Sequence, residues 1–125
     1  MNDWLNIKGK TVLVTGASSG IGKAIVEEFL ELGVNVANFD LSDNDLRHPN
    51  LLFVKVDVTS RSEVEAGVAK IVEKFGNIDA VVNNAGINIP RLLIDAENPK
   101  GPYELDDETF EKVTMINQKG LYLVS

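Results

Sequence analysis

The chain has 125 residues and a formal net charge of −7, with 44% hydrophobic and 25% charged residues. These values indicate one globular domain, because a chain of this length can bury a core of ordinary proportions. The acidic balance and the lack of a basic run exclude nucleic acid as an expected partner, since clustered Lys and Arg supply most of that affinity. Without cysteine, there is no thiolate nucleophile or cysteine-based metal site, and we predict no metal site.

The sequence predicts no association with a membrane. No apolar run approaches the ~20 residues that a membrane span needs. The N-terminal segment has neither the basic start nor the apolar core of a signal peptide. We therefore expect a cytoplasmic protein without a membrane partner.

The first half of the chain predicts a strand followed by a helix. Residues 10–15 are a short apolar run that ends at glycine, as expected for a strand covered on both faces. The next segment has apolar residues at spacings of three and four, which predicts a helix ended by Gly33. Its expected buried face consists of Ile21, Ile25, Phe29 and Leu32.

Three more strands are predicted, at residues 34–39, 51–56 and 79–83. Between the last two, the pattern of a capping box at residues 60–63 predicts a second helix, which ends at Gly76. Its expected buried face consists of Val64, Val68, Ile71 and Phe75. This alternation of strands and helices requires a parallel sheet with right-handed crossovers.

Residues 86–106 contain three prolines and predict a loop that is longer than most connections, and such loops are usually functional or mobile. A last helix is predicted to start with Asp106 as its N-cap and to continue to the end of the sequence. Because this helix has no stop signal, we expect residues 1–125 to be cut from a longer protein.

The turn after the first strand has the features of a phosphate-binding site. It contains Gly16, Gly20 and Gly22 and leads directly into the first predicted helix. A helix N-terminus offers unpaired N–H groups and a partial positive charge, and glycines let the backbone approach a pyrophosphate closely. An ATP-binding loop would need Ser or Thr after the lysine, but Lys23 is followed by Ala24. An ordinary strand-to-helix turn is the remaining alternative.

Five separated motifs together resemble the short-chain dehydrogenase/reductase family, and they span the chain. They are the glycine-rich turn, Asp40 after the second strand, Asp57-Val58 after the third, Asn83-Asn84-Ala85-Gly86 after the fourth, and Asn117 in the last helix. The resemblance implies an α/β fold with a Rossmann-type, doubly wound parallel sheet of strand order 3-2-1-4, the remainder being absent. It implies that residues 1–125 are an NAD-binding Rossmann domain truncated to the N-terminal half of a single-domain protein. It also implies a catalytic Ser and a Tyr-x-x-x-Lys motif, which these residues do not include. We therefore expect residues 1–125 alone to be inactive.

The resemblance implies a set of cofactor-binding residues. They are Gly16, Ser18, Ser19, Gly20, Ile21, Gly22, Asp40, Leu41, Asp57, Val58, Asn84, Ala85 and Gly86. The glycine-rich turn would hold the pyrophosphate, Asp57 and Val58 would border the adenine, and Asn84 would close the nicotinamide-side ribose site. Structural alternatives stay open, with Asp57 as a helix-start residue and Asn84 as support for the fourth strand. Ser18 and Ser19 could likewise only keep the loop polar.

Asp40 predicts the choice of cofactor. It lies 24 residues after Gly16, near the offset of about 20 that is expected for a ribose-binding acid. An ionised carboxylate can accept hydrogen bonds from two ribose hydroxyls, whereas a 2′-phosphate in the same place would be a like-charge contact that costs several kcal/mol. We predict NAD in preference to NADP. The alternative is an acid in an ordinary strand-to-loop turn.

Asn117 is the one catalytic residue that the resemblance places in this chain. In the family, such an Asn helps to hold a water that links the catalytic Lys to solvent, so this role depends on a longer chain. Within residues 1–125 we expect Asn117 to be buried and to be satisfied by the backbone.

The resemblance implies an NAD-dependent oxidoreductase that transfers a hydride between a secondary alcohol and the nicotinamide. Residues 88–93 and 115–125 are similar to family members that act on a polyol or a sugar-alcohol phosphate, and Arg91 and Lys100 could contact such a phosphate or simply be solvated. At full length we expect a homo-oligomer. Two alternatives stay open, a non-catalytic NAD-binding module and a short-chain reductase of a 3-oxoacyl or hydroxysteroid substrate.

Overall fold

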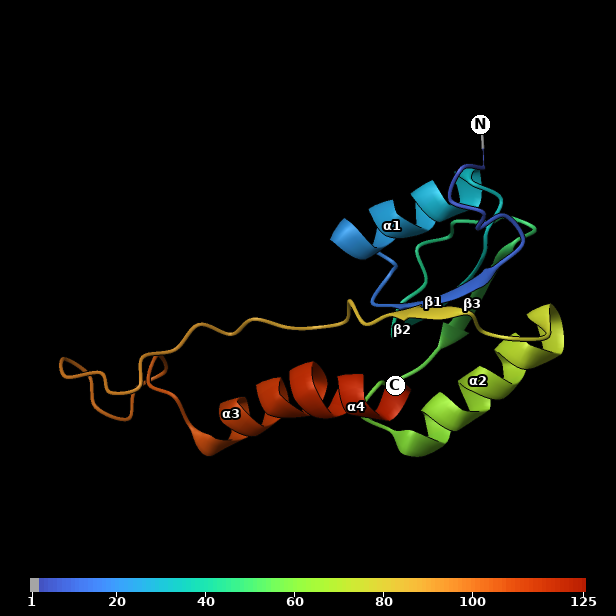
Figure 1. Cartoon of the computed structure of the whole chain (residues 1–125). Coiled ribbons are helices and arrows are strands. Elements are labelled where there is room, and N and C mark those ends of the chain that lie inside the picture. The colour runs from blue at the N-terminus through green and yellow to red at the C-terminus, as the bar shows by residue number, and fades with distance from the viewer. Residues whose placement is uncertain (1–2) are drawn as a thin grey trace.

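A parallel four-stranded sheet is the centre of the molecule, seen here in a computed structural model that describes residues 3–125 (Figure 1). Residues 1 and 2 of the expected domain lie outside the described part. The strands are β1 (Thr11–Thr15), β2 (Asn35–Asp40), β3 (Leu51–Lys55) and β4 (Ala80–Val82). Their order in the sheet is β3-β2-β1-β4, and every neighbouring pair is parallel. The predicted α/β class and the strand order 3-2-1-4 are confirmed.

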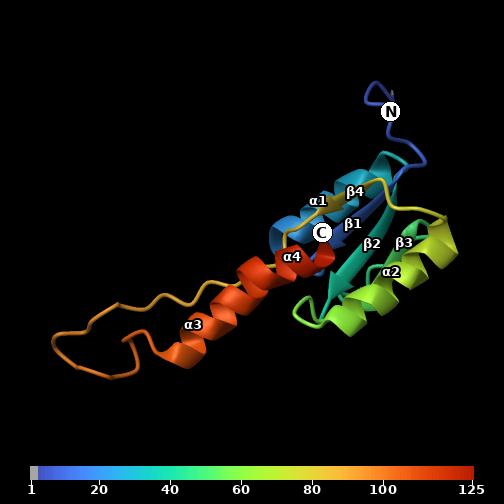
Figure 2. The same ribbon diagram turned by 60° about the horizontal axis from the view of Figure 1, so that its bottom comes forward.

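Helices cover both faces of this sheet, which makes the fold doubly wound (Figures 1 and 2). Helix α1 (Gly20–Glu31) lies on one face, and α2 (Arg61–Phe75) lies on the other together with the C-terminal helical segment. That segment consists of α3 (Asp107–Thr114), the π-helical stretch η1 (Met115–Gly120) and α4 (Leu121–Val124). No helix within residues 3–125 has the length and apolar character needed to cross a membrane.

Two apolar clusters, one on each face, bury the strands from both sides. The cluster under α1 contains Val12, Val14, Ala17, Val26, Leu30, Val34 and Val36. The cluster under α2 and α4 contains Leu13, Ala37, Phe39, Val54, Val56, Val58, Val64, Ile71 and Val124. Successive strand residues alternate between these clusters, which is why β1 and β2 appear in the sequence as continuous apolar runs.

The buried face of α1 differs from the expected one. Its buried residues are Gly22, Val26 and Leu30. Ile25, Phe29 and Leu32 are partly buried around them, as predicted, but Ile21 is 76% exposed. The reason is steric, because a Cβ on Gly22 would lie only 2.5 Å from the Gly16 carbonyl oxygen. The helix therefore turns its glycine toward the sheet and Ile21 toward solvent.

Helix α2 begins and ends as predicted, but its capping box is formed only in part. The Ser60 hydroxyl accepts a hydrogen bond from the Glu63 N–H at 3.4 Å. The Glu63 carboxylate, however, accepts from the Asp57 N–H at 3.3 Å instead of reaching back to Ser60. The Ser60 N–H donates to the Asp57 carbonyl at 2.9 Å. Glu63 thereby ties the first turn of α2 to the segment that follows β3.

The segment between β4 and α3 projects away from the sheet in both views (orange, Figures 1 and 2). It contains no helix, in agreement with the predicted loop, but it is internally ordered. The Leu92 N–H donates to the Tyr103 carbonyl at 2.8 Å, and the Leu105 N–H donates to the Leu92 carbonyl at 2.7 Å. Two backbone N–H groups, those of Asp95 and Lys100, donate to one carboxylate oxygen of Glu104 at 3.1 Å each.

The last helical segment starts as predicted and then departs from an α-helix. The Asp106 carboxylate accepts from the Thr109 N–H at 2.7 Å, and this hydrogen bond lowers the pKa of Asp106 below its ordinary value. The π-helical turn η1 was not predicted. It brings Gly120 against the segment after β3, where a Cβ on Gly120 would lie 2.7 Å from Val58 Cγ2.

We predict that Gly67→Ala destabilises the fold. A Cβ at this buried position of α2 would lie 2.6 Å from Phe39 Cζ. Overpacking of this kind costs about 1–3 kcal/mol and exceeds the gain of about 1 kcal/mol in helix propensity. Urea unfolding followed by circular dichroism should therefore show a lower free energy of unfolding. Glu65→Ala on the exposed side of the same helix is the control and should change it by less than about 0.5 kcal/mol. Equal stabilities would mean that α2 moves freely over Phe39.

Candidate functional site

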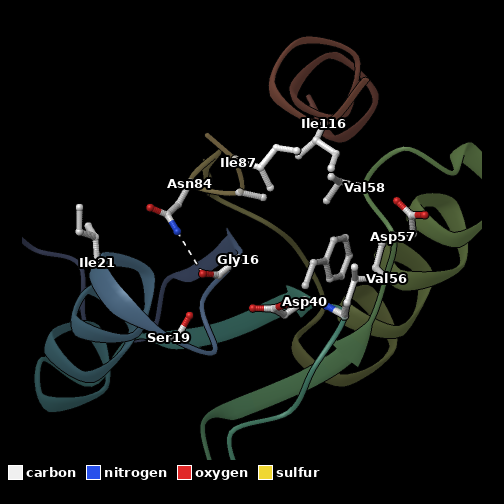
Figure 3. Close-up of a pocket in the computed structure, with 14 residues that line it drawn as sticks. Gly16, Ser19, Ile21, Asp40, Val56, Asp57, Val58, Asn84, Ile87 and Ile116 are labelled. Atoms are coloured by element: carbon white, nitrogen blue, oxygen red, sulfur yellow. Dashed lines mark hydrogen bonds between the residues drawn. The ribbon is translucent and has the colours of Figure 1, made fainter. Parts of the chain in front are cut away.

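A cavity of about 400 Å³ lies at the carboxyl ends of the strands, between the start of α1 and η1 (Figure 3). Its walls are formed by Gly16, Ser19, Ile21, Phe39, Asp40, Leu41, Val56, Asp57, Val58, Asn84, Ala85, Gly86, Ile87 and Ile116. The strand order reverses at β1, with β2 on one side and β4 on the other. Open α/β sheets bind their ligands at such a switch point.

The glycine-rich turn is fastened to β2 by three successive backbone N–H groups, those of residues 16–18. In chain order, their acceptors are the Phe39 carbonyl at 2.8 Å, Asn38 Oδ1 at 3.1 Å and Asp40 Oδ2 at 3.0 Å. Because one backbone and two side-chain acceptors of the same strand are used, the path of the turn relative to β2 is fixed at three consecutive residues.

The next four backbone N–H groups, those of residues 19–22, donate to no acceptor within residues 3–125. The first N–H of the helix that is bonded belongs to Lys23, which donates to the Ser19 carbonyl at 3.2 Å. Ser19 occupies the N-cap position, but its side chain does not cap the helix. The N-terminus of α1 therefore keeps its free donors and its dipole charge at the edge of the cavity, an arrangement suited to an anion.

The segment after β4 packs directly on the turn. The Asn84 side chain donates to the Gly16 carbonyl at 3.1 Å, as Figure 3 shows, and the Ala85 N–H donates to Thr15 Oγ1 at 3.0 Å. Gly16 has a φ of +66°, and a Cβ there would lie 2.9 Å from Ala85 Cα. Glycine at this position thus serves both the backbone conformation and the close contact.

Asp40 lies in the cavity wall with its side chain partly exposed. Its carboxylate accepts hydrogen bonds from backbone N–H groups. Oδ2 accepts from the Ser18 N–H, and Oδ1 accepts from the Leu41 N–H at 2.7 Å. Oδ1 also accepts from the Ser42 N–H at 3.4 Å. A carboxylate offers about four acceptor positions, so a position on Oδ2 stays available. None of the ion pairs within residues 3–125 involves Asp40.

Asp57 and Val58 border the cavity at the end of β3. Asp57 Oδ1 accepts from the Thr59 N–H at 2.9 Å and from the Thr59 hydroxyl at 2.6 Å. The N-cap of α2 is Ser60, so Asp57 shapes the turn before the helix without capping it. Its Oδ2 accepts no hydrogen bond from residues 3–125 and is available at the cavity.

Asn117 lies in η1, and its side chain forms two hydrogen bonds with the backbone of Ile87. Oδ1 accepts from the Ile87 N–H at 2.8 Å, and Nδ2 donates to the Ile87 carbonyl at 2.9 Å. The expected backbone satisfaction is confirmed, but the expected burial is wrong, because Asn117 is exposed. Asn117 does not line the cavity, whereas Ile87 does.

The structure gathers most of the predicted residues in one place. Every expected cofactor-binding residue lines the cavity except Ser18, Gly20 and Gly22, which belong to the same turn. Sequence reasoning missed four apolar wall residues, which are Phe39, Val56, Ile87 and Ile116. Phe39 and Val56 directly precede the predicted acids Asp40 and Asp57 in the sequence, and they could have been inferred from that position.

Ile87 and Ile116 could not have been inferred, because they come from an irregular segment and a π-helical turn. In Figure 3 their side chains meet that of Val58 across one side of the cavity. Arg91 and Lys100, the candidates for a substrate phosphate, lie on the projecting segment and do not line the cavity. The Arg91 guanidinium donates to the Pro90 carbonyl at 2.8 Å.

Comparison with known proteins assigns this arrangement to a family. The sequence pattern of the short chain dehydrogenases matches residues 10–125. The chain belongs to the short-chain dehydrogenase family. A sorbitol-6-phosphate 2-dehydrogenase of Klebsiella pneumoniae is 45% identical to it, with coverage of 100% of this chain and 48% of that protein. A 3beta-hydroxysteroid dehydrogenase 2 of Eggerthella lenta is 38% identical, with coverage of 89% and 43%.

A solved structure shares the fold of this short-chain dehydrogenase. The 3-ketoacyl-(acyl-carrier-protein) reductase of Brucella melitensis, crystallised with NADH, superposes with a TM-score of 0.81 at 30% identity, over 94% of this chain and 48% of the other. The chain spans about half the length of the curated relatives that it matches.

We predict that Gly16→Ala destabilises the protein more than Gly9→Ala. Both glycines have positive φ, +66° and +81°, so both substitutions place an alanine in the left-handed region, which costs about 1–2 kcal/mol. Only the Gly16 variant also pushes on Ala85, since a Cβ on Gly9 would have no atom within 4 Å. Urea unfolding should show an additional loss of about 1–3 kcal/mol for Gly16→Ala. Equal losses would mean that the segment after β4 is not held against the turn.

Proposed function

We propose that this chain is the dinucleotide-binding part of an NAD-dependent oxidoreductase. The full enzyme would transfer a hydride between a secondary alcohol of a polyol or sugar-alcohol phosphate, of the sorbitol-6-phosphate type, and the nicotinamide. The observation that carries the proposal is the row of four free N–H groups, residues 19–22, at the edge of a cavity that also contains Asp40. Family membership and the similarity to a sorbitol-6-phosphate 2-dehydrogenase support it.

The residues of the cavity fit a nicotinamide dinucleotide by their chemistry. The free N–H groups suit a pyrophosphate, and the cavity volume of about 400 Å³ lies within the range of small-molecule sites. Asp40 can accept hydrogen bonds from ribose hydroxyls, and Asp57 with Val58 can border an adenine. The segment at Asn84 can close the second ribose site. When bound, the cofactor would supply hydride transfer, while the residues named here would bind and orient it.

Asp40 supports NAD over NADP as the cofactor. Its carboxylate forms no ion pair within residues 3–125, and none of the residues that line the cavity is Lys or Arg. Ser19, next to the pyrophosphate position, is uncharged as well. A phosphate at this place would meet one carboxylate and no compensating Lys or Arg, which disfavours NADP.

We also infer that residues 1–125 form the N-terminal half of a single-domain protein that is a homo-oligomer at full length. The intact mass of the protein in its source cells tests this. A mass near twice 13.6 kDa would support the enzyme, whose catalytic Ser and Tyr-x-x-x-Lys would lie in the other half. A mass of 13.6 kDa would instead favour the alternative of a non-catalytic NAD-binding module. The cytoplasmic location remains a prediction from the sequence.

Substrate assays on the full protein would separate the remaining alternatives. We expect NAD reduction with sorbitol 6-phosphate and no reaction with a 3-hydroxysteroid or a 3-hydroxyacyl thioester. The hydroxysteroid dehydrogenase and 3-ketoacyl reductase among the relatives are the reason to test these two classes. Turnover of either one without turnover of the polyol phosphate would replace the proposed substrate. Residues 1–125 alone should turn over none of them.

We predict that Asp40→Asn shifts cofactor preference toward NADP. The variant keeps one acceptor oxygen, which can serve the Ser18 N–H, and removes the charge that opposes a 2′-phosphate; the exposed Leu41 N–H can turn to water. Fluorescence titration with NADH and NADPH should show the ratio of their Kd values moving by at least about tenfold in favour of NADPH, which corresponds to about 1.4 kcal/mol. Asp45→Asn makes the same charge change at a side chain that is 96% exposed and should leave the ratio unchanged. An unchanged ratio in Asp40→Asn would contradict the role of Asp40.

A further inference from the structure

One amide side chain is buried in β2 directly beside the glycine-rich turn. Asn38 is 4% exposed, although it lies in the middle of β2 between the apolar residues Ala37 and Phe39. It shares the face of the strand with Val36, which belongs to the apolar cluster under α1. Packing alone would favour an aliphatic residue at this position, since an amide is unfavourable in an apolar interior unless its polar atoms are bonded.

Both polar atoms of Asn38 are bonded, and both bonds go to the turn. Oδ1 accepts from the Ala17 N–H at 3.1 Å, and Nδ2 donates to Ser18 Oγ at 3.0 Å. The orientation of the amide is determined by this pattern, because the reversed amide would place its NH₂ group against the Ala17 N–H. Both hydrogen bonds of the side chain thus go to two consecutive residues of the turn.

The bonded residues of the turn depend on Asn38 in return. Ala17 is 1% exposed, so its N–H would have no access to water if the Asn38 oxygen were removed. The Ser18 hydroxyl, which accepts from Asn38, keeps its own proton for donation elsewhere. The Ser18 N–H is held by Asp40 at 3.0 Å, so the constraint imposed by Asn38 extends to the proposed ribose-binding carboxylate.

We propose that Asn38 is a positioning residue for the dinucleotide. It touches the turn one residue before the free N–H groups of residues 19–22 and fixes the backbone from which they project. Donors that are held in place before binding lose less entropy when the ligand arrives, which increases affinity. This inference rests on the proposed function, since it assumes that the turn binds the pyrophosphate of NAD.

The test is made on the full protein. It compares the variant Asn38→Leu with Val36→Ala, a matched variant on the same face of the same strand. Asn38→Leu continues the apolar cluster but leaves the Ala17 N–H without an acceptor. We expect its Kd for NADH, measured by fluorescence titration, to rise about tenfold or more. Hydrogen exchange measured by NMR should accelerate at least about tenfold at the Ala17 amide while the Leu13 amide of β1 stays as protected as in the wild type.

Val36→Ala should give the opposite pattern. It lowers the stability of the whole sheet, so exchange should accelerate at Leu13 and Ala17 alike, while the Kd for NADH stays within about twofold of the wild type. If Asn38→Leu does not fold, Asn38→Ala removes the same two hydrogen bonds without adding volume, and the same changes are expected.

Two results would overturn the inference, and they are distinct from a failure of the proposed function. One is a folded Asn38 variant that binds NADH within twofold of the wild type. The other is a loss of affinity that accompanies equal acceleration at Leu13 and Ala17, which would assign Asn38 a general structural role. If the full wild-type protein binds no NADH, the proposed function fails, and this inference fails with it.

Discussion

The hydrogen bonds between residues 16–18 and β2 are the constraint on which the site depends. They bond the N–H groups of residues 16–18, whereas the N–H groups of Ser19 and of the first three residues of α1 stay unpaired and no side chain caps the helix. An uncapped helix end is ordinarily unfavourable. Here the turn before it is held by the neighbouring strand, and the unpaired donors form the surface to which we assign the pyrophosphate.

Close contacts at two glycines determine where the walls of the cavity stand. Gly22 lets α1 approach the turn and Asn84, and Gly120 lets η1 approach Val58. At both places a Cβ would lie under 3.0 Å from a neighbouring atom, a separation at which the packed elements must move apart. Two helices and the segment after β4 can therefore surround one cavity without filling it, and the apolar side chains of Ile87 and Ile116 complete its wall.

The sequence predicted those parts of the molecule that depend on local patterns. Strands buried on both faces give apolar runs, and Asp106 caps α3 through its own neighbour Thr109. Ile21 was misplaced because helical spacing alone does not reveal that Gly22 must face the sheet. The π-helical turn η1 has no residue signature, and the pairing of Asn117 with Ile87 joins residues far apart in the chain. A polar residue amid apolar neighbours in β2 was the one available signal for Asn38.

Asp40 links the shape of the turn to the choice of cofactor. The carboxylate that would accept the ribose hydroxyls also accepts the Ser18 N–H, and Ser18 in turn is held by Asn38. Replacing this acid by an aliphatic residue would remove the charge that opposes a 2′-phosphate. It would also leave the Ser18 N–H without its acceptor. A change of cofactor preference at this site therefore requires a residue that lacks the charge but keeps an acceptor for the Ser18 N–H. In the proposed site, affinity for the pyrophosphate and selectivity at the ribose would be coupled through one pair of hydrogen bonds, those from the Ser18 N–H to Asp40 and from Asn38 to the Ser18 hydroxyl.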